Sequence, residues 1–265
     1  MSALFDLHEG ASPLILSFPH SGTHMPQDIA KTLAPSSKAL EDTDWHVPRL
    51  YDFAKALDVT WIEARVSRYV IDLNRDPGGA SLYPGQTTTA LCPLESFAGE
   101  TLWQQGLAPD EAEIARRKTH FFAPYHDALA AQITRVKARH GFAILYDCHS
   151  IRGVVPGLFE GELPTLNLGT NKGQSCAEGL QKMVETVMAK GPFSQVSNGR
   201  FRGGWITRHY GRPHENVHAL QMELAQRAYM DESPPWRWNA APATRLQETL
   251  GAIVDSILEW ANTKT

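Results

Sequence analysis

Residues Phe142 to Ser150 have the sequence FAILYDCHS, in which five apolar residues run directly into Asp147, Cys148, His149 and Ser150. A short continuous apolar run of this kind is typical of a strand buried on both faces of a sheet. Side chains alternate along a strand, so Asp147 and His149 share one face and Cys148 points to the other, where it packs as an apolar residue. We therefore predict a buried strand that presents an aspartate and a histidine together at its carboxyl end.

Three other apolar runs have the same form, because each ends in a polar residue or carries one near its end. They are Pro13–Phe18 (PLILSF) before Pro19 and His20, the VSRYVIDL part of Trp61–Leu73 before Asn74 and Arg75, and Val217–Leu224 (VHALQMEL), which contains Glu223. We predict a strand from each of these runs.

Helical spacing lies between and after these runs. One apolar face is formed by Leu129, Ile133 and Val136, and another by Leu246, Leu250, Ile253 and Ile257. Strands that alternate with helices favour an α/β fold, and in its largely parallel sheets ligands bind beyond the carboxyl ends of the strands. We predict a single domain, residues 1–265, with a mixed, mostly parallel sheet flanked by helices.

Composition narrows the class of protein. The chain has 265 residues, of which 42% are hydrophobic and 20% charged, and its formal net charge is −4. These values suit a folded domain and argue against partners such as nucleic acid or an anionic membrane surface. The three cysteines, Cys92, Cys148 and Cys176, are widely spaced, which argues against disulfides or a Cys-rich zinc site. No signal peptide or membrane-spanning run is apparent, so we expect a soluble, cytoplasmic protein; its oligomeric state is left open.

The segment from about Asp76 to Pro109 is rich in Gly, Pro and Thr and has little periodicity. It is longer than an ordinary connection, and long loops in compact domains are often lids or binding loops. We predict an elaborate loop near the site.

The polar residues after the predicted strands suggest a metal site. His20 and His149 provide two imidazoles, and a catalytic zinc usually has three protein ligands and one open position. The third ligand can come from the acidic stretch EDTDWH, where Asp44 is favoured and Glu41, Asp42 and His46 compete with it. Asp147 suits the role of a carboxylate that orients His149 from behind.

Each of these residues also has a simpler explanation. His20 alone would more often be a turn or capping histidine, and Asp44 could cap a helix that begins near Val47. Asp147 could equally cap a helix or bind backbone. Glu223 is an acid in an apolar strand, costly to bury without a partner, and is our candidate general base. Its simpler role is a structural ion pair, for example with Arg227.

Arginines complete the set. Arg68 and Arg75 flank the end of the VSRYVIDL run, and the stretch NGRFRGGWITRHY contains Arg200, Arg202, Arg208 and His209. Arginine binds carboxylates with paired hydrogen bonds, which suits a dicarboxylate substrate. For any one of them a surface ion pair is the commoner explanation.

These motifs together resemble the N-formylglutamate amidohydrolases of histidine degradation. The resemblance rests on PHSG, DTDWHVPRLY, SRYVIDLNRDP, YDCHSIRG, NLGT, NGRFRGGWITRHYG and QMELAQ, which follow in order along nearly the whole chain. It implies a fold related to the zinc carboxypeptidases (phosphorylase/hydrolase-like) and to aspartoacylase-type deacylases. Those relatives place an acid three residues after the first histidine, where this chain has Thr23, so the carboxylate ligand must come from elsewhere.

The resemblance implies a role for each site residue. It makes His20, Asp44 and His149 the ligands of one divalent metal ion, expected to be zinc, with iron, cobalt or manganese also compatible. It makes Glu223 the general base and Asn74 and Arg75 contacts to the substrate or its oxyanion, with Arg75 counted as catalytic. Further substrate contacts are expected from Arg68, Arg202, Arg208 and His209.

The expected reaction is metal-assisted hydrolysis of N-formyl-L-glutamate to formate and glutamate, the last step of a histidine degradation route. A related deacylase of another N-acyl amino acid is the nearest alternative, and a non-catalytic carboxylate-binding protein is a more distant one. A serine hydrolase is disfavoured because the chain has no G-x-S-x-G motif.

Overall fold

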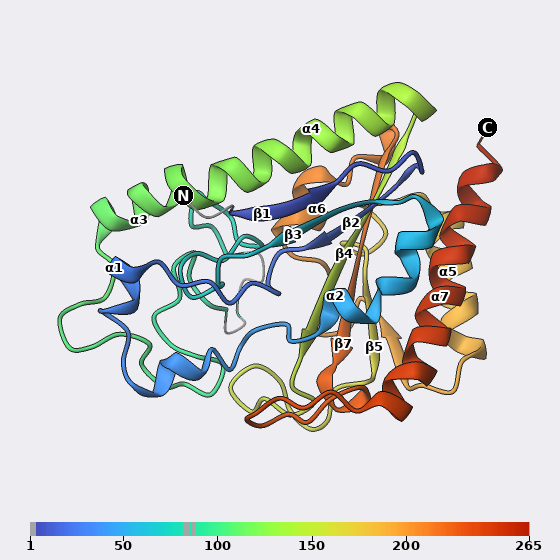
Figure 1. Ribbon diagram of the computed structural model, residues 1–265. Helices are drawn as coiled ribbons and strands as arrows, with labels where there is room; N and C mark the ends of the chain where they lie inside the picture. Colours follow the sequence, from blue (N-terminus) through green and yellow to red (C-terminus); the bar gives the residue numbers. More distant parts are fainter. Residues whose placement is uncertain (1–3, 82–84, 86–87, 265) are drawn as a thin grey trace.

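The computed structural model describes residues 4–81, 85 and 88–264. Seven strands within that part of the chain form one sheet in the order β1-β3-β2-β4-β7-β5-β6 (Figure 1). The strands are β1 (Phe5–His8), β2 (Leu14–Phe18), β3 (Thr60–Ala64), β4 (Ala143–Ile151), β5 (Leu166–Gly169), β6 (Gln195–Ser197) and β7 (Val217–Ala225). The β1–β3 and β5–β7 pairs are antiparallel and the other four pairs are parallel. The predicted α/β class with a mixed, mostly parallel sheet is confirmed.

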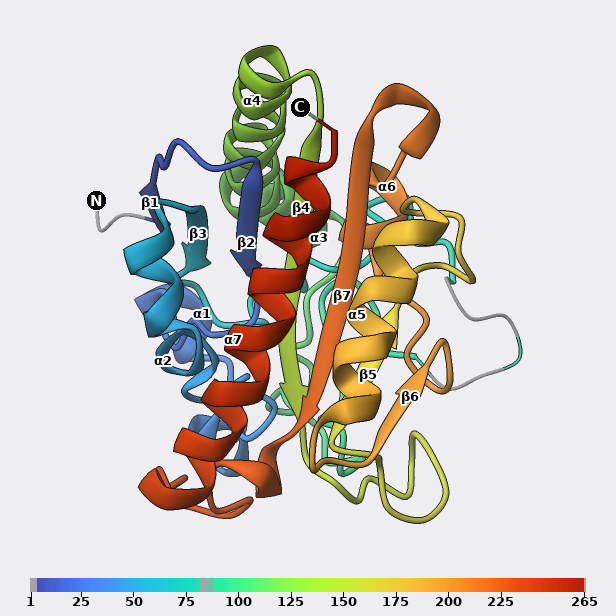
Figure 2. The same cartoon turned by 90° about the vertical axis from the view of Figure 1, so that its right-hand side faces the viewer.

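Helices cover both faces of the sheet. The α-helices are α1 (Gln27–Ala30), α2 (Val47–Leu50), α3 (Glu111–Arg117), α4 (Ala123–His140), α5 (Glu178–Lys190), α6 (Trp205–Tyr210) and α7 (Ala240–Asn262). Short 3-10 turns are η1 (Ser36–Ala39), η2 (Asp52–Leu57), η4 (Pro213–Glu215) and η5 (Gln226–Ala228), and a π-helical turn, η3 (Lys118–Phe122), joins α3 to α4. Figure 2 shows α5 and α7 side by side on one face of the sheet, with α4 on the other.

The two faces bury separate apolar cores. Side chains of α2, α5 and α7 pack with Tyr146, Cys148 and Met222. Side chains of α3, α4 and α6 pack with Leu145 and Ala219 on the opposite face. The predicted helices around Ile133 and Ile253 are confirmed as α4 and α7. The alternation predicted for β4 is also confirmed, because Cys148 lies in the α5–α7 core.

The central strands β4 and β7 bring the polar residues to one edge. All nine residues of each strand are buried, and their parallel register places His149 opposite Glu223 and Asp147 opposite Gln221. Strand β2 runs parallel to β4 on its other side and ends two residues before His20. The carboxyl ends of three neighbouring parallel strands therefore meet where the site was predicted.

One predicted strand is wrong. After β3 the chain makes a single parallel bridge at Val66 and then turns, so VSRYVIDL forms no strand. The Ser67 hydroxyl accepts a hydrogen bond from the backbone N–H of Tyr69 at 3.2 Å, and the Ser67 carbonyl accepts from Val70 at 2.9 Å. The run is apolar because Tyr69, Val70 and Ile71 fill the α4 core from a turn.

The long loop from Asp76 to Pro109 has no helix or strand among its described residues, although residues 82–84 and 86–87 lie outside that description. Isolated bridges such as Glu95–Thr101 organise it. The cysteines Cys92, Cys148 and Cys176 are buried and form no disulfide. Across the described residues, no helix has both the length and the apolar character needed to cross a bilayer.

A buried histidine attaches α4 to the turn that leads into the site. His126 is 6% exposed, and its Nε2 donates to the carbonyl of Leu73 at 2.9 Å. Burial lowers the pKa of His126 to about 3. The folded protein therefore holds His126 neutral at a pH where the unfolded chain begins to protonate it.

This depressed pKa predicts acid sensitivity. In the unfolded chain His126 has a pKa of about 6.5, so above that pH it does not affect the free energy of unfolding. As pH falls from about 6.5 toward 3, protonation of the unfolded chain lowers the free energy of unfolding by up to about 1.4 kcal/mol per pH unit. Urea unfolding at pH 7 and pH 5 should show a larger loss of unfolding free energy for the wild type than for His126→Gln, which does not titrate. Equal losses in the two proteins would contradict this account of His126.

Candidate active site

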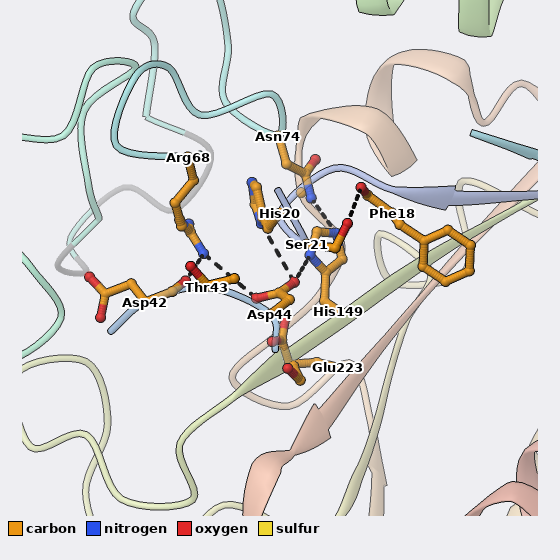
Figure 3. Close-up of polar contacts among 12 residues, drawn as sticks. Phe18, His20, Ser21, Asp42, Thr43, Asp44, Arg68, Asn74, His149 and Glu223 are labelled. Carbon is orange, nitrogen blue, oxygen red and sulfur yellow. Dashed lines mark hydrogen bonds and ion pairs between the residues drawn. The ribbon is translucent and has the colours of Figure 1, made fainter. Parts of the chain in front are cut away.

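Three buried side chains from separate parts of the chain meet at the carboxyl edge of the sheet. His20 follows β2, His149 lies near the end of β4, and Asp44 comes from the segment between η1 and α2. One potential ligand atom from each lies within 4.8 Å of the others, an arrangement that could hold a metal ion. Figure 3 shows both imidazoles directed at the Asp44 carboxylate.

The Nδ1 atoms of the two imidazoles face Asp44. Nδ1 of His149 is 3.0 Å, and Nδ1 of His20 is 3.8 Å, from Oδ2 of Asp44. The other oxygen of Asp44, Oδ1, is buried without a hydrogen-bond partner among the described residues. The group thus offers two imidazole nitrogens and a carboxylate with an unsatisfied oxygen.

The Nε2 atoms are held from behind by two other aspartates. Nε2 of His20 lies 2.7 Å from Asp72 Oδ1, and Nε2 of His149 lies 2.8 Å from Asp147 Oδ2. Both aspartates are fully buried. Such a carboxylate fixes the tautomer and orientation of a ligand imidazole. The predicted pairing of Asp147 with His149 is confirmed, and Asp72 plays the same part for His20.

Burial and neighbouring charges shift the pKa values of the two histidines and of Asp72. Burial and then the charge of Arg68 lower the pKa of His20. Burial also disfavours a charged His149, but the carboxylates of Asp147 and Asp44 raise its pKa well above the usual value. Asp72 is buried too, and the charges of His20, Arg75 and Arg68 keep its pKa well below the usual value.

The backbone around Asp44 is anchored on both sides. Its N–H donates to the carbonyl of His20 at 3.0 Å, while Gln226 and Tyr229 donate to the carbonyls of Thr43 and Trp45. The N-cap of α2 is His46, so Asp44 does not serve as the cap.

The three competing ligands are engaged elsewhere. Asp42 accepts a hydrogen bond from the backbone N–H of Phe97 at 2.8 Å. Glu41 lies 3.7 Å from Arg152, and Nε2 of His46 lies 2.7 Å from the carbonyl of Trp236. The geometry therefore favours Asp44 over Glu41, Asp42 and His46.

Glu223 lies beside this group on β7. Its Oε2 accepts a hydrogen bond from Gln221 at 3.2 Å, and burial raises its pKa to about 8. Arg227, the partner expected for a structural ion pair, lies 2.6 Å from Glu162 instead. Glu223 is thus a buried carboxyl with a raised proton affinity, as a general base requires.

A cleft of about 590 Å³, including its open mouth, reaches both histidines and Glu223. Its wall contains His20, His149, Asn74 and Glu223, three arginines (Arg68, Arg75 and Arg200), and Thr88, Thr89 and Phe97 of the long loop. The described part of that loop therefore borders the site, as predicted.

The arginines of the cleft are held by backbone and side-chain contacts. Nε and Nη2 of Arg75 donate to the carbonyl and hydroxyl oxygens of Thr89 at 3.2 and 3.0 Å. Nε of Arg200 donates to the carbonyl of Leu158 at 2.7 Å. Arg68 donates to Asp72 at 2.7 Å, and the ring of Phe97 lies over its guanidinium.

Three of the predicted substrate contacts do not line this cleft. Arg202, Arg208 and His209 are not among the described residues that line the cleft. His209 stacks on Trp205 and borders a separate depression beside α4. Their contact with substrate stays a prediction.

Sequence comparison decides the family. The family model of N-formylglutamate amidohydrolases matches residues 12–230. A Pseudomonas aeruginosa protein named N-formylglutamate deformylase is 44% identical over 98% of both chains. A Pseudomonas putida protein of the same name is 42% identical over 98% of this chain and 97% of its own. The chain belongs to the N-formylglutamate amidohydrolase family.

A solved structure agrees with this membership. The crystal structure of the Ralstonia eutropha N-formylglutamate amidohydrolase superposes with a TM-score of 0.82 at 25% identity, covering 98% of this chain and 99% of the other. A protein from Agrobacterium tumefaciens shares the fold, with a TM-score of 0.70 at 20% identity over 96% of this chain and 95% of its own.

In this member of the N-formylglutamate amidohydrolase family, the residues fit a divalent metal ion. Two imidazole nitrogens and a carboxylate are ligands that such ions commonly take. Five carboxyl groups are buried around one buried guanidinium, that of Arg68; they belong to Asp42, Asp44, Asp72, Asp147 and Glu223. Oδ1 of Asp44 accepts no hydrogen bond from the described residues and lies 3.9 Å from Nη1 of Arg68, so a bound cation would add compensating positive charge there.

Arg200, Gln221 and Asp72 were not among the site residues predicted from the sequence, and Arg200 was named only as one arginine of its stretch. Gln221 and Asp72 are polar residues inside otherwise apolar runs, a signal that identified Glu223 and could have identified them too. Arg200 carried no comparable signal, because nothing in the sequence distinguishes it from Arg202 and Arg208 of the same stretch.

A matched pair of variants tests the choice of carboxylate. Asp44→Asn should weaken zinc binding by more than about 100-fold, because loss of a ligand exceeds the 10–100-fold typical of a residue behind a ligand. Asp42→Asn keeps an oxygen for the Phe97 N–H and should bind zinc like the wild type. Zinc titration against a chromophoric chelator measures both; the reverse order would show that Asp42 is the ligand.

Proposed function

We propose that this chain hydrolyses N-formyl-L-glutamate to formate and L-glutamate, with one zinc ion held by His20, Asp44 and His149. The observation that carries the proposal is the buried His–Asp–His group beside Glu223, in a cleft lined by arginines. Relatives that are 42–44% identical over almost the whole chain and bear the name N-formylglutamate deformylase support the choice of substrate.

Glu223 acts as the proton carrier of the reaction. A divalent ion, when bound, supplies positive charge that acidifies water and polarises the formyl carbonyl. Glu223 takes a proton from the attacking water and later delivers one to the departing glutamate nitrogen. Water adds its oxygen to the formyl carbon, the C–N bond breaks, and the products are formate and glutamate.

Arginines in the cleft bind charge on the substrate. Arg75, fixed by Thr89, donates to the oxygen that gains negative charge during attack. Arg200 reaches the same cleft and binds a carboxylate of the substrate. The resemblance to the family implies that this reaction is the last step of a histidine degradation route.

Release of glutamate from N-formyl-L-glutamate tests the proposed function. The purified protein should release glutamate, lose that activity after chelation and regain it when zinc is added. A panel of N-acyl glutamates and aspartates run beside it identifies the preferred acyl group. Activity on another member of the panel, without release from N-formyl-L-glutamate under any metal, would contradict the substrate assignment.

Replacing the proposed base should stop turnover without removing the metal. Glu223→Gln should lower kcat by about 10²–10⁴-fold, the usual contribution of a positioned proton carrier. Its zinc affinity should stay close to that of the wild type. Glu215→Gln, in the exposed turn η4 that precedes β7, is the control. Near-normal kcat in Glu223→Gln would refute the base assignment.

Variants of Arg200 and Arg202 test which of these two arginines binds the substrate. Arg200→Gln should raise KM for N-formyl-L-glutamate by about 10–100-fold, because it removes a charge-assisted bond of about 1.5–3 kcal/mol. Arg202→Gln, two residues along the same segment, should raise KM less. Steady-state kinetics decide between them, and a larger effect at Arg202 would contradict the choice of Arg200 and support the Arg202 contact predicted from the sequence.

A further inference from the structure

Asn74 lies between the two aspartates that orient the histidines. Its backbone N–H donates to Asp72 Oδ1 at 2.9 Å, and its side-chain Nδ2 donates to Asp147 Oδ2 at 3.1 Å. The same Nδ2 lies 2.9 Å from Nε2 of His149. Figure 3 shows the Asn74 side chain directed at His149. One residue therefore touches both carboxylate–histidine pairs.

The acceptor groups of Asn74 face the opposite direction. Its side-chain Oδ1 accepts from the N–H of Ile206 at 2.8 Å, and its backbone carbonyl accepts from the N–H of Trp205 at 3.3 Å. These are the first two residues of α6, which directly follows the segment containing Arg200 and Arg202. Asn74 thus joins the histidine pairs to the start of α6.

Gly204 allows this close approach. A Cβ placed on Gly204 would overlap the Asn74 side-chain amide. The backbone N–H of Gly204 also donates to Gln221 Oε1 at 2.7 Å, and Gln221 is the residue that binds Glu223. The backbone of Gly204 is therefore held on two sides, by packing against Asn74 and by the hydrogen bond to Gln221.

The backbone N–H, the backbone carbonyl, Oδ1 and one hydrogen of Nδ2 of Asn74 are therefore engaged in hydrogen bonds, and the residue is 3% exposed. Turning the amide toward a substrate would break its bonds to Asp147 and to Ile206, at the cost of leaving buried groups unpaired. This differs from the substrate or oxyanion contact that the family resemblance implies for Asn74.

We propose that Asn74 is a positioning residue. It holds the aspartates behind the two histidines and the arginine-bearing segment 199–204 in one arrangement, so that metal binding and substrate binding depend on the same side chain. The inference rests on the proposed function, since it concerns the metal ligands and arginines named there.

Zinc affinity, measured without substrate, is the primary test. Asn74→Ala removes the donor to Asp147 and the acceptor for Ile206, so the zinc Kd should rise about 10–100-fold, the usual effect of losing a partner behind a ligand. KM should rise as well, and excess zinc should restore part of kcat while leaving KM raised.

A second variant tests the same contact from the other side. Gly204→Ala keeps the Asn74 residue, but the new methyl group pushes the Asn74 side-chain amide out of position. It should therefore reproduce the weaker zinc binding and the higher KM. It also keeps the test decisive if Asn74→Ala does not fold. Gly251→Ala in α7 is the matched control, because the new Cβ would meet only Phe53, at 3.9 Å, and zinc binding should be unchanged.

The alternative role gives a different result. If Asn74 contacts the substrate or its oxyanion, Asn74→Ala and Gly204→Ala would lower kcat/KM with the zinc Kd of the wild type, and that outcome would overturn the inference. Absence of zinc binding by the wild type would overturn both the inference and the proposed function. Zinc binding that both variants weaken, in a protein without activity on N-formyl-L-glutamate, would support the inference and contradict only the proposed substrate.

Discussion

The site depends on two hydrogen bonds, those from Nε2 of His20 to Asp72 and from Nε2 of His149 to Asp147. They turn the opposite nitrogen, Nδ1, of each ring toward Asp44. A fully buried carboxylate is stable only when donors surround it. Asp147 receives hydrogen bonds from Ser17 and Asn74 as well as its histidine, and Asp72 receives them from Arg68 and Asn74. The polar residues that interrupt the apolar core thus satisfy one another.

The sheet makes this possible because β2, β4 and β7 are parallel neighbours. Their carboxyl ends coincide, and the β4–β7 register places His149 opposite Glu223. Alternation along β4 sends Cys148 into the core under α5 and α7, while Asp147 and His149 face the site. The same strand therefore carries both core packing and the proposed chemistry.

Much of this arrangement could be predicted from the sequence, and the exceptions share a cause. Predominantly apolar runs identified β2, β4 and β7, and strand alternation identified the Asp147–His149 pair. The same apolar signal failed at residues 66–73, where Ser67 caps a turn with its own hydroxyl. Loop residues lack the regular spacing that shows which side chains share a face. Asp42 could therefore be distinguished from Asp44 only in the structure, by its bond to the Phe97 N–H. Arg200 could be told from Arg202 only by which of them lines the cleft.

The central claim is that the aspartate-held histidines present Nδ1 to a metal ion together with Asp44. Anomalous diffraction at the zinc edge, on crystals of the zinc-loaded protein, tests it most directly. We predict one zinc peak bound by Nδ1 of His20, Nδ1 of His149 and the Asp44 carboxylate, with Asp72 and Asp147 still bonded to the Nε2 atoms. A zinc ion bound through Nε2, or held by Asp42 or Glu41 in place of Asp44, would contradict the account.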